Sequence, residues 1–447
     1  MNTLPLRALW KRRSLERRGS WTRARLEAHQ AEHVTALRRF ALERSPFYRR
    51  FHRGLEHAPL TDLPILTKST MMENFDDLVT DRAIRLADVN GFLNSDPGLN
   101  LFRGRYVALA TSGSTGLRGV FLFDEREWLA ALANIARPMA WAGLKPSLLR
   151  PARTAMLAST TPWHYSSRVG LSLASRFIPT LRFDAAELIE SMVSRLNQWR
   201  PEVLAVYPSV LRQLAEEQIA GRLRIPLRHV STSAEVLTPA TRQLVRQAWN
   251  INVYDTYGAT EYAPIAAECS YGRKHLVEDG AVIEISGDRI LLTIFDRYTQ
   301  PLIRYEISDM VRAIEGDCEC GRPFRLIEAV EGRQEDVLYF RSRNPRSSPI
   351  AVHPNSIHNL LETVPATGWQ VLQEDEALYV CLNGLRDAGA AAAIERAFTD
   401  FLFSQGADPP PVRVTTTTSF RRGATGKAPL IIRAGVRAKA AAQTESS

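Results

Sequence analysis

Short apolar runs alternate with longer helical patterns through the middle of the chain, and this alternation constrains the fold more than any other feature. Runs typical of buried strands lie at residues 105–110, 120–123, 154–159, 203–207, 229–235 and 252–258. Helical patterns separate several of them, at residues 125–142, 184–199, 208–220 and 238–249. Asp184 and Thr238 are suited to the N-cap positions of two of these helices. Strands that alternate with helices favour a mostly parallel sheet covered on both faces, so we predict an α/β fold.

Two further regions flank this alternation. The first 50 residues have the character of a basic helical lead-in, with an amphipathic helix predicted over residues 22–44. Short β segments dominate from about residue 262 to 335, which indicates a small β subdomain. We therefore expect a large N-terminal domain over residues 1–335, with mixed and parallel sheets, and a small α+β C-terminal domain over residues 336–447.

The net charge of +9 is concentrated at the N-terminus. Residues 1–50 contain 13 Lys and Arg against four acidic residues, so this segment accounts for the whole excess. Such asymmetry raises nucleic acid or an anionic surface as a partner of this segment. The composition, 45% hydrophobic and 23% charged, excludes disorder of most of the chain. With four Cys and neither a long apolar stretch nor a secretory leader pattern, we expect a cytoplasmic protein without a membrane span.

One loop between two strand-like runs is rich in hydroxyl side chains and glycine. It reads Thr111-Ser112-Gly113-Ser114-Thr115-Gly116. Glycine lets the backbone approach an anion closely, and hydroxyls supply neutral hydrogen-bond donors for phosphate oxygens. The loop lacks the Gly-Lys-Ser/Thr ending of a Walker loop. Taken alone it fits either an anion-binding loop or a flexible turn.

Four further motifs follow in order along the chain. They are YGATE at 257–261, PLIRYEISD at 301–309, GRQED at 332–336 and TGKAP at 425–429. The first follows a predicted strand and so places an aromatic, a hydroxyl and a carboxylate where open α/β sheets bind ligands. With TSGSTG, this set resembles the core motifs of the adenylate-forming superfamily of acyl-CoA synthetases, adenylation domains and luciferases. LPILTK, YPSVL and STSAE resemble its phenylacetate–CoA ligase-like branch.

The resemblance implies an AMP-forming carboxylate–CoA ligase. Such an enzyme uses ATP and Mg²⁺ to convert a carboxylic acid into an acyl-adenylate with release of pyrophosphate, and then passes the acyl group to CoA. Transfer to a carrier protein or an amine stays open. A nucleic-acid or anionic-surface binding protein is the rival from another class, although we expect no nucleic-acid partner. The substrate acid and the oligomeric state, which includes a dimer, are not decided by the sequence.

The resemblance also implies roles for individual residues. Lys427 would reach the acyl-adenylate, Thr260 the α-phosphate, Glu261 the Mg²⁺ ion and Glu335 the hinge of the C-terminal lid. The ATP and AMP contacts would come from Thr111, Ser112, Gly113, Ser114, Thr115, Gly116, Ser233, Ala234, Glu235, Tyr257, Gly258, Asp309 and Arg333. The chain departs from the family pattern at Leu117-Arg118-Gly119, where Pro-Lys-Gly is usual, and at Glu335, where Asp is usual.

Two further groups are candidates on their residue types. Cys269, His275, Cys318 and Cys320 form two short arms that could hold a structural Zn²⁺ ion, the alternative being buried free thiols. The resemblance supports the zinc interpretation, because members of the branch carry a similar arrangement. Trp163, His164 and Tyr165 follow the strand-like run at 154–159, so they could line an acyl pocket or simply pack in a loop.

Overall fold

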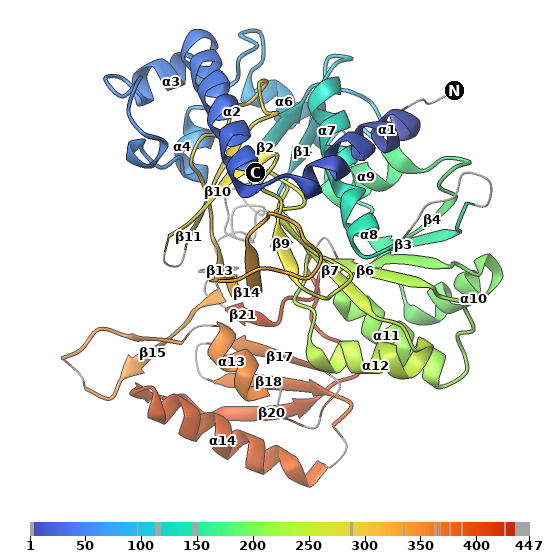
Figure 1. Ribbon diagram of the computed structural model, residues 1–447. Helices are drawn as coiled ribbons and strands as arrows, with labels where there is room; N and C mark the ends of the chain where they lie inside the picture. Colours follow the sequence, from blue (N-terminus) through green and yellow to red (C-terminus); the bar gives the residue numbers. More distant parts are fainter. Residues whose placement is uncertain are drawn as a thin grey trace.

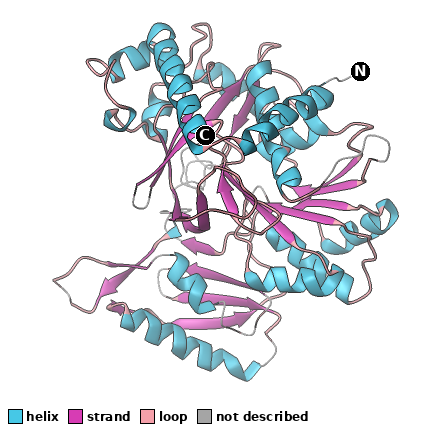
Figure 2. Cartoon of the chain, in the orientation of Figure 1, coloured by secondary structure: helices cyan, strands magenta, loops and turns pink. Residues whose placement is uncertain are grey.

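The computed structural model describes the chain at residues 4–95, 97–111, 118–144, 151–286, 289–333, 336–344, 346–352, 354–361, 364, 366, 368–374, 377–385, 388–423 and 426–433. Helices and strands are mixed along its whole length (Figures 1 and 2). The C-terminal residues, orange to red in Figure 1, form a separate lower layer beneath the N-terminal part. The predicted α/β class is confirmed.

A nine-stranded sheet forms the centre of the molecule, in the order β13-β14-β9-β8-β7-β6-β5-β3-β4. The five consecutive strands at one end run parallel: β7 (Val253–Tyr257), β6 (His229–Ser233), β5 (Val203–Val206), β3 (Thr154–Ala158) and β4 (Thr180–Asp184). The other four pair antiparallel: β8 (Ala266–Glu268), β9 (Lys274–Leu276), β14 (Leu326–Arg333) and β13 (Asp309–Ile314). Part of the β-rich region after residue 262 thus extends the large sheet.

Three amphipathic helices cover one face of the parallel strands. They are α10 (Ile189–Trp199), α11 (Pro208–Ile219) and α12 (Pro239–Trp249). Ala155 and Leu157 of β3 are buried in the core that these helices complete. The opposite face lies toward α7 (Glu125–Ile135), α8 (Arg137–Trp141) and α9 (Tyr165–Leu173). Side chains alternate between the two faces of a strand, so each strand supplies one row to each side.

One predicted helix start is wrong. Asp184 was expected to cap a helix, but it ends strand β4, and helix α10 begins at Ile189. The Asp184 carboxylate accepts hydrogen bonds from the backbone N–H groups of Thr160 and Ala186. The Asp184 carboxylate therefore accepts backbone hydrogen bonds as an N-cap residue would, but here these bonds stabilise the turn that follows strand β4. Thr238 does cap α12, because its hydroxyl accepts from the Thr241 N–H at 3.1 Å.

The N-terminal segment packs on the core through helices. It contains α1 (Leu4–Glu16), the 3₁₀ turn η1 (Arg17–Ser20), α2 (Arg23–Arg44), α3 (Pro46–Phe51), α4 (Lys68–Glu73), α5 (Phe75–Leu78) and α6 (Leu86–Asn94). The helix predicted over 22–44 is confirmed as α2, with Leu26, Leu37 and Ala41 buried. Two small sheets complete this region: β1 (Val107–Ala110) with β2 (Val120–Phe123), and β10 (Ala281–Ser286) with β11 (Arg289–Ile294) and β12 (Tyr305–Ile307).

Several of the N-terminal arginines pair with acids from distant parts of the chain. Arg23 contacts Glu278 at 3.0 Å, and Arg18 lies 3.7 Å from Asp279. Arg7 pairs with Glu125 of α7. The basic excess of the first 50 residues therefore includes charges that pair with acids of the underlying core, Glu278 and Asp279 among them.

The C-terminal residues form their own hydrophobic core between residues 338 and 431. Its sheets are β16 (Ile350–Val352), β15 (Leu338–Ser342) and β19 (Ala407–Asp408), and β20 (Val412–Thr416), β18 (Leu378–Asn383), β17 (Gly368–Gln373) and β21 (Ile431–Arg433). Helices α13 (Pro354–Leu361) and α14 (Ala391–Ser404) pack on them, with the short 3₁₀ turn η4 (Ala388–Ala390) before α14. The hinge predicted at Glu335 lies outside the described residues, so the boundary there stays a prediction. No helix among the described residues is long and apolar enough to cross a membrane.

Candidate active site

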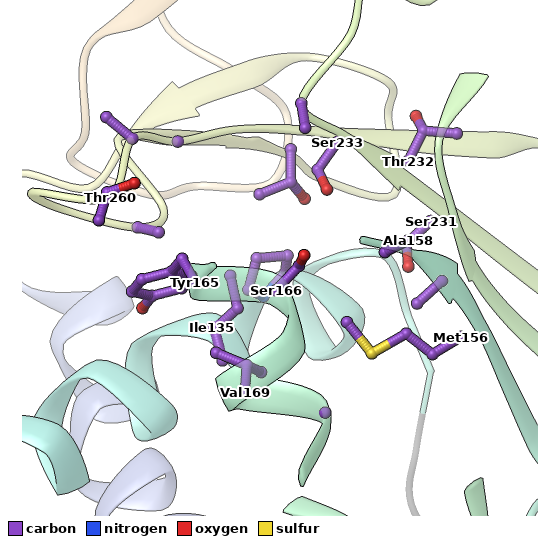
Figure 3. Close-up of a pocket in the computed structure, with 18 of the residues that line it drawn as sticks. Ile135, Met156, Ala158, Tyr165, Ser166, Val169, Ser231, Thr232, Ser233 and Thr260 are labelled. Atoms are coloured by element: carbon purple, nitrogen blue, oxygen red, sulfur yellow. The ribbon is translucent and has the colours of Figure 1, made fainter. Parts of the chain in front are cut away.

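A cavity of about 910 Å³ lies beside the carboxyl ends of the parallel strands. Ala158 of β3, Ser233 of β6 and Thr256 of β7 line it, and the loops at 258–261 and 305–309 complete its polar end (Figure 3). Parallel strands present their carboxyl ends at one edge, which is where open α/β sheets bind ligands. Residues that are far apart in the sequence therefore meet at one site.

The motif residues Thr260, Glu261 and Asp309 all line this cavity. The Tyr257 hydroxyl donates to Asp309 Oδ2 at 2.8 Å, so a tyrosine at the end of β7 orients the carboxylate that begins β13. The side chain of Tyr257 lies behind Asp309 and does not itself line the cavity. The backbone of Arg333 pairs with Asp309 across β13 and β14, while its side chain lies outside the described residues.

Glu261 is buried at the polar end of the cavity. The Tyr305 hydroxyl donates to its Oε1 at 3.0 Å. Burial raises the pKa of Glu261, and the positive charge of Lys68 opposes that shift. Lys68 lines the same cavity, together with Thr67, whose hydroxyl caps α4. Sequence reasoning noted the LPILTK segment but missed Lys68 as a site residue; a cation directly after an N-cap threonine was the available signal.

Thr111 closes the base of the hydroxyl-rich loop. Its backbone N–H donates to the Gly119 carbonyl at 2.9 Å, and its hydroxyl accepts from the Gly119 N–H at 2.8 Å. Strands β1 and β2 therefore hold the two ends of the loop together, with Thr111 at the cavity wall. The predicted phosphate contacts Ser112, Gly113, Ser114, Thr115 and Gly116 lie outside the described residues.

Glu235 has a different position from the one that the resemblance implied. Ser233 and Ala234 line the cavity, but Glu235 does not. Its carboxylate accepts from the N–H and the hydroxyl of Ser209, at 2.9 and 3.1 Å, and from the backbone N–H of Ala428 at 2.7 Å. Ala234 has a φ of 72°, in the left-handed region, and this turns the next residue away from the cavity. The Glu235 carboxylate thus contacts the C-terminal layer in this structure, and its role in the adenine pocket stays a prediction.

Lys427 reaches the cavity from the C-terminal layer. Its ammonium group lies 6.0 Å from the ring centroid of Tyr207. The neighbouring loop is held by Arg422, which donates to the Gly426 carbonyl at 2.7 Å and to the Ser209 hydroxyl at 3.2 Å. Gly426 has a φ of 75°, and a Cβ there would lie only 3.0 Å from the Ala185 Cβ, so glycine permits this close approach.

His164 and Tyr165 line the cavity, whereas Trp163 does not. The guanidinium of Arg118 lies 4.5 Å from the centroid of the Trp163 ring instead. Burial, with a smaller contribution from the positive charge of Lys427, lowers the pKa of His164 to about 3. Its Nδ1 lies 2.9 Å from the Ser166 hydroxyl. The imidazole is therefore neutral at pH 7 and adds a polar but uncharged group to the wall.

Cys269, His275, Cys318 and Cys320 meet in a second cluster, with all four ligand atoms within 4.8 Å of one another. The two sulfurs of Cys269 and Cys318 are 3.7 Å apart, and the Cys320 sulfur is 3.2 Å from His275 Nε2. Tetrahedral Zn²⁺ with Zn–S bonds of about 2.3 Å places two sulfurs roughly 3.8 Å apart. His275 Nδ1 lies 3.3 Å from the Phe324 carbonyl, which leaves Nε2 directed at the thiols. The donor set and its spacing fit a zinc ion.

The sequence is similar to that of known enzymes. The family model described as "AMP-binding enzyme" matches residues 106–285. Phenylacetate-coenzyme A ligase of Thermus thermophilus is 24% identical over 379 residues, which is 77% of this chain and 76% of that protein. Residues 106–285 thus match an AMP-binding enzyme domain, and most of the chain is similar to a phenylacetate-coenzyme A ligase. A further relative is Protein CapK of Staphylococcus aureus, 22% identical over 64% of this chain and 61% of that protein.

Solved structures of adenylate-forming enzymes share the fold. A 2-hydroxyisobutyryl-CoA ligase in its postadenylation state superposes with a TM-score of 0.71 at 18% identity, over 97% of this chain and 94% of that one. The same ligase in its thioesterification state has a TM-score of 0.58, also over 97% and 94%.

Proposed function

We propose that this protein activates a carboxylic acid with ATP and then transfers the acyl group to the thiol of CoA. In the first step the carboxylate attacks the α-phosphorus of ATP, which forms an acyl-adenylate and expels pyrophosphate. In the second step the thiol displaces AMP and a thioester is formed. The observation that carries the proposal is the meeting of Lys427, Thr260, Glu261 and Asp309 around one cavity, although Lys427 belongs to a different layer from the other three.

The proposed roles follow from the charges that the first step creates. Negative charge grows on the oxygens around the α-phosphorus, and the Lys427 ammonium is the cation of the C-terminal layer that reaches the cavity. The Thr260 hydroxyl offers a neutral donor beside it. Asp309, oriented by Tyr257, offers a carboxylate that can accept from the two ribose hydroxyls. Because His164 is neutral, it adds no positive charge to its part of the cavity wall that would compete with Lys427 for the carboxylate of the substrate.

Glu261 is the residue that could hold Mg²⁺. Magnesium prefers hard oxygen ligands and usually combines one or two carboxylates with substrate phosphates. Glu261 satisfies this requirement, because Tyr305 engages one of its oxygens and the residue faces the cavity. A bound Mg²⁺ ion would neutralise phosphate charge as pyrophosphate leaves.

The experiment is pyrophosphate exchange into ATP, measured with a panel of carboxylic acids. Wild-type protein should exchange with at least one acid, and Lys427→Ala should lower the rate by roughly 10²–10³ as for loss of one preorganised donor. Arg433→Ala provides a matched control, since this cation belongs to the same layer but packs on Tyr339. Absence of exchange with every acid, by protein that is folded and binds ATP, contradicts the proposal.

The acceptor is tested separately by trapping the product. Incubation with ATP, the acid and CoA should give the acyl-CoA thioester. An acyl-adenylate that stays unchanged with CoA, but reacts with a carrier-protein thiol or an amine, would replace CoA by one of those acceptors.

We also propose that Cys269, His275, Cys318 and Cys320 bind a structural Zn²⁺ ion. Four protein ligands leave no open position, so the ion would stabilise the junction of β8, β9 and the segment at 318–324 without taking part in catalysis. No disulfide joins the four cysteines, all of which lie in the described part of the chain, and this supports a reducing, cytoplasmic environment.

A further inference from the structure

The cavity continues well beyond its polar end, along the face of the sheet that α10–α12 leave uncovered. Thr154, Met156 and Ala158 line it from β3, one residue in two, while the residues between them pack in the opposite core. A strand rises about 3.3 Å per residue, so the stretch from Ala158 to Thr154 spans roughly 13 Å. We call this part of the cavity, from Ala158 to Thr154, the apolar arm.

Small side chains create the depth of the apolar arm at its middle. Met156 pairs with Ala205 on β5, and Ala205 pairs with Ser231 on β6, so these residues form one row across three strands. All three line the cavity and keep partial accessibility within a central part of the sheet. Leucine or isoleucine at Ala205 or Ser231 would fill this space.

The opposite wall of the arm consists of helices. Ile135 of α7 and Val169 of α9 face the sheet residues Met156 and Ser231 across the space (Figure 3). Leu173 and Phe177 continue this wall. A Cβ on Gly170 would lie 2.7 Å from the Met156 sulfur, so glycine sets how closely α9 approaches β3.

The N-terminal helix α1 adds the outermost part of the wall. Leu9 and Arg12 both line the cavity. Arg12 is 7% exposed and pairs with Glu16 of its own helix at 3.0 Å. The basic segment thus contributes Leu9 to the wall of the arm, and the positive charge of Arg12 lies against the carboxylate of Glu16.

The polarity of the cavity changes along its length. Thr260, Glu261, Asp309 and Lys427 gather at the polar end, and the walls of the arm are mainly aliphatic. Arg228, the other charged residue near the far end, pairs with Glu202 at 3.0 Å. An ionised or amide group pushed into the arm would lose its hydration without gaining a partner, whereas a hydrocarbon tail would gain from burial.

We propose that the apolar arm binds the tail of the substrate acid, and that the preferred substrates are acids with an extended, uncharged apolar tail that reaches past Met156. This inference rests on the proposed function. The carboxylate would lie near Lys427 and the tail would run along the row of Met156, Ala205 and Ser231. An acid as short as acetate has no tail to enter the apolar arm, so it would gain no binding energy there.

The experiment compares straight-chain acids of increasing length in pyrophosphate exchange, with phenylacetate included. Burial of each CH₂ should raise kcat/KM by roughly fourfold until the arm is filled. Ala205→Leu should lower kcat/KM for long acids by at least tenfold and leave short acids within about twofold. Leu204→Met is the matched control on the other face of the same strand, and it should keep the wild-type length profile.

The outcomes separate the two proposals. Exchange with short acids that does not rise with chain length overturns the inference but leaves the proposed function intact. An equal effect of Ala205→Leu on all lengths, in protein with an unchanged melting temperature, also overturns it. Exchange with no acid overturns the proposed function; in that case the thermal shift produced by decanoate without ATP tests the arm directly, and a shift that Ala205→Leu abolishes supports tail binding.

Discussion

Glu235 Oε1 accepts a hydrogen bond from the backbone N–H of Ala428 at 2.7 Å, and this contact joins the sheet to the residue that follows Lys427. Ser209 donates two further hydrogen bonds to the same carboxylate. Three donors thus converge on the Glu235 carboxylate, which can only accept. We infer that the contact between Glu235 and Ala428 holds the neighbouring Lys427 in the cavity. Burial raises the pKa of Glu235, while the hydrogen bonds oppose the shift.

Replacement of Glu235 should therefore affect the first half-reaction selectively. In Glu235→Gln an amide N–H₂ group faces one of the converging donors, and a lost hydrogen bond to a charged group costs about 1.5–3 kcal/mol. We expect pyrophosphate exchange to fall by roughly tenfold to a hundredfold. We further propose that the C-terminal layer reorients between the two half-reactions and then no longer uses this contact, so thioester formation from preformed acyl-adenylate should change by less than about twofold. Glu217→Gln on α11 is the control, because that carboxylate pairs with Arg222 and does not line the cavity.

Tyr257→Phe should weaken ATP binding without loosening the fold. The variant leaves Asp309 without the donor that orients it, so we expect the KM for ATP to rise by roughly tenfold while kcat changes little. Tyr262→Phe is a suitable control, since its hydroxyl is also buried but donates to the Val277 carbonyl at 2.9 Å. An equal rise in KM for both variants would show that orientation of Asp309 is not the cause.

Stability should fall as the pH decreases below the ordinary pKa of histidine. His164 has a folded pKa of about 3, so between pH 6.5 and about 3 the unfolded chain binds a proton that the folded chain does not. Its contribution is therefore complete above pH 6.5 and is lost as the pH falls toward 3, at up to about 1.4 kcal/mol per pH unit. Urea denaturation at pH 7 and pH 5 should show a smaller decline for His164→Gln than for wild type or for His57→Gln, which changes an exposed histidine.

Purified protein should contain one zinc ion per chain. Cys318→Ser should lose the metal. Removal of zinc from the wild-type protein by a strong chelator should lower the melting temperature, because the thiolates then lose the ion that they share. Cys381→Ser changes the cysteine outside the cluster, so it should keep the full metal content. Wild-type protein without stoichiometric zinc, prepared with metal present, would identify the cluster as a set of buried thiols.

The buried pair of Arg137 and Asp279 should be far more important for stability than a surface pair. Both side chains are at most 1% exposed, and their charged atoms are 2.8 Å apart. Arg137→Met leaves the buried Asp279 with Arg18, 3.7 Å away, as its charged partner among the described residues, and breaking such a buried pair costs about 3–5 kcal/mol. Arg50→Met breaks the exposed pair with Asp77 and should cost at most about 1 kcal/mol in the same urea titration.

Much of the architecture follows from local pattern. The runs that became β3, β5, β6 and β7 were recognisable because a buried strand has a short apolar sequence bounded by polar residues. Thr238 and Pro239 marked the start of α12, and the spacing of Leu26, Leu37 and Ala41 marked α2. Ordered motifs also identified the residues at the polar end of the cavity. Periodicity and capping depend on neighbours along the chain, so a single sequence contains them.

Other features depend on contacts between distant residues. Glu235 belongs to the STSAE segment that was predicted to contact ATP, yet its carboxylate is directed toward Ala428, and Asp184 has the chemistry of a helix cap but ends β4. The apolar arm exists because Ala205 and Ser231 are small at a position where three strands form one row, and because a helix from the first 16 residues closes it. Which side chains meet across such distances is decided by packing of the whole chain, and no local pattern records it.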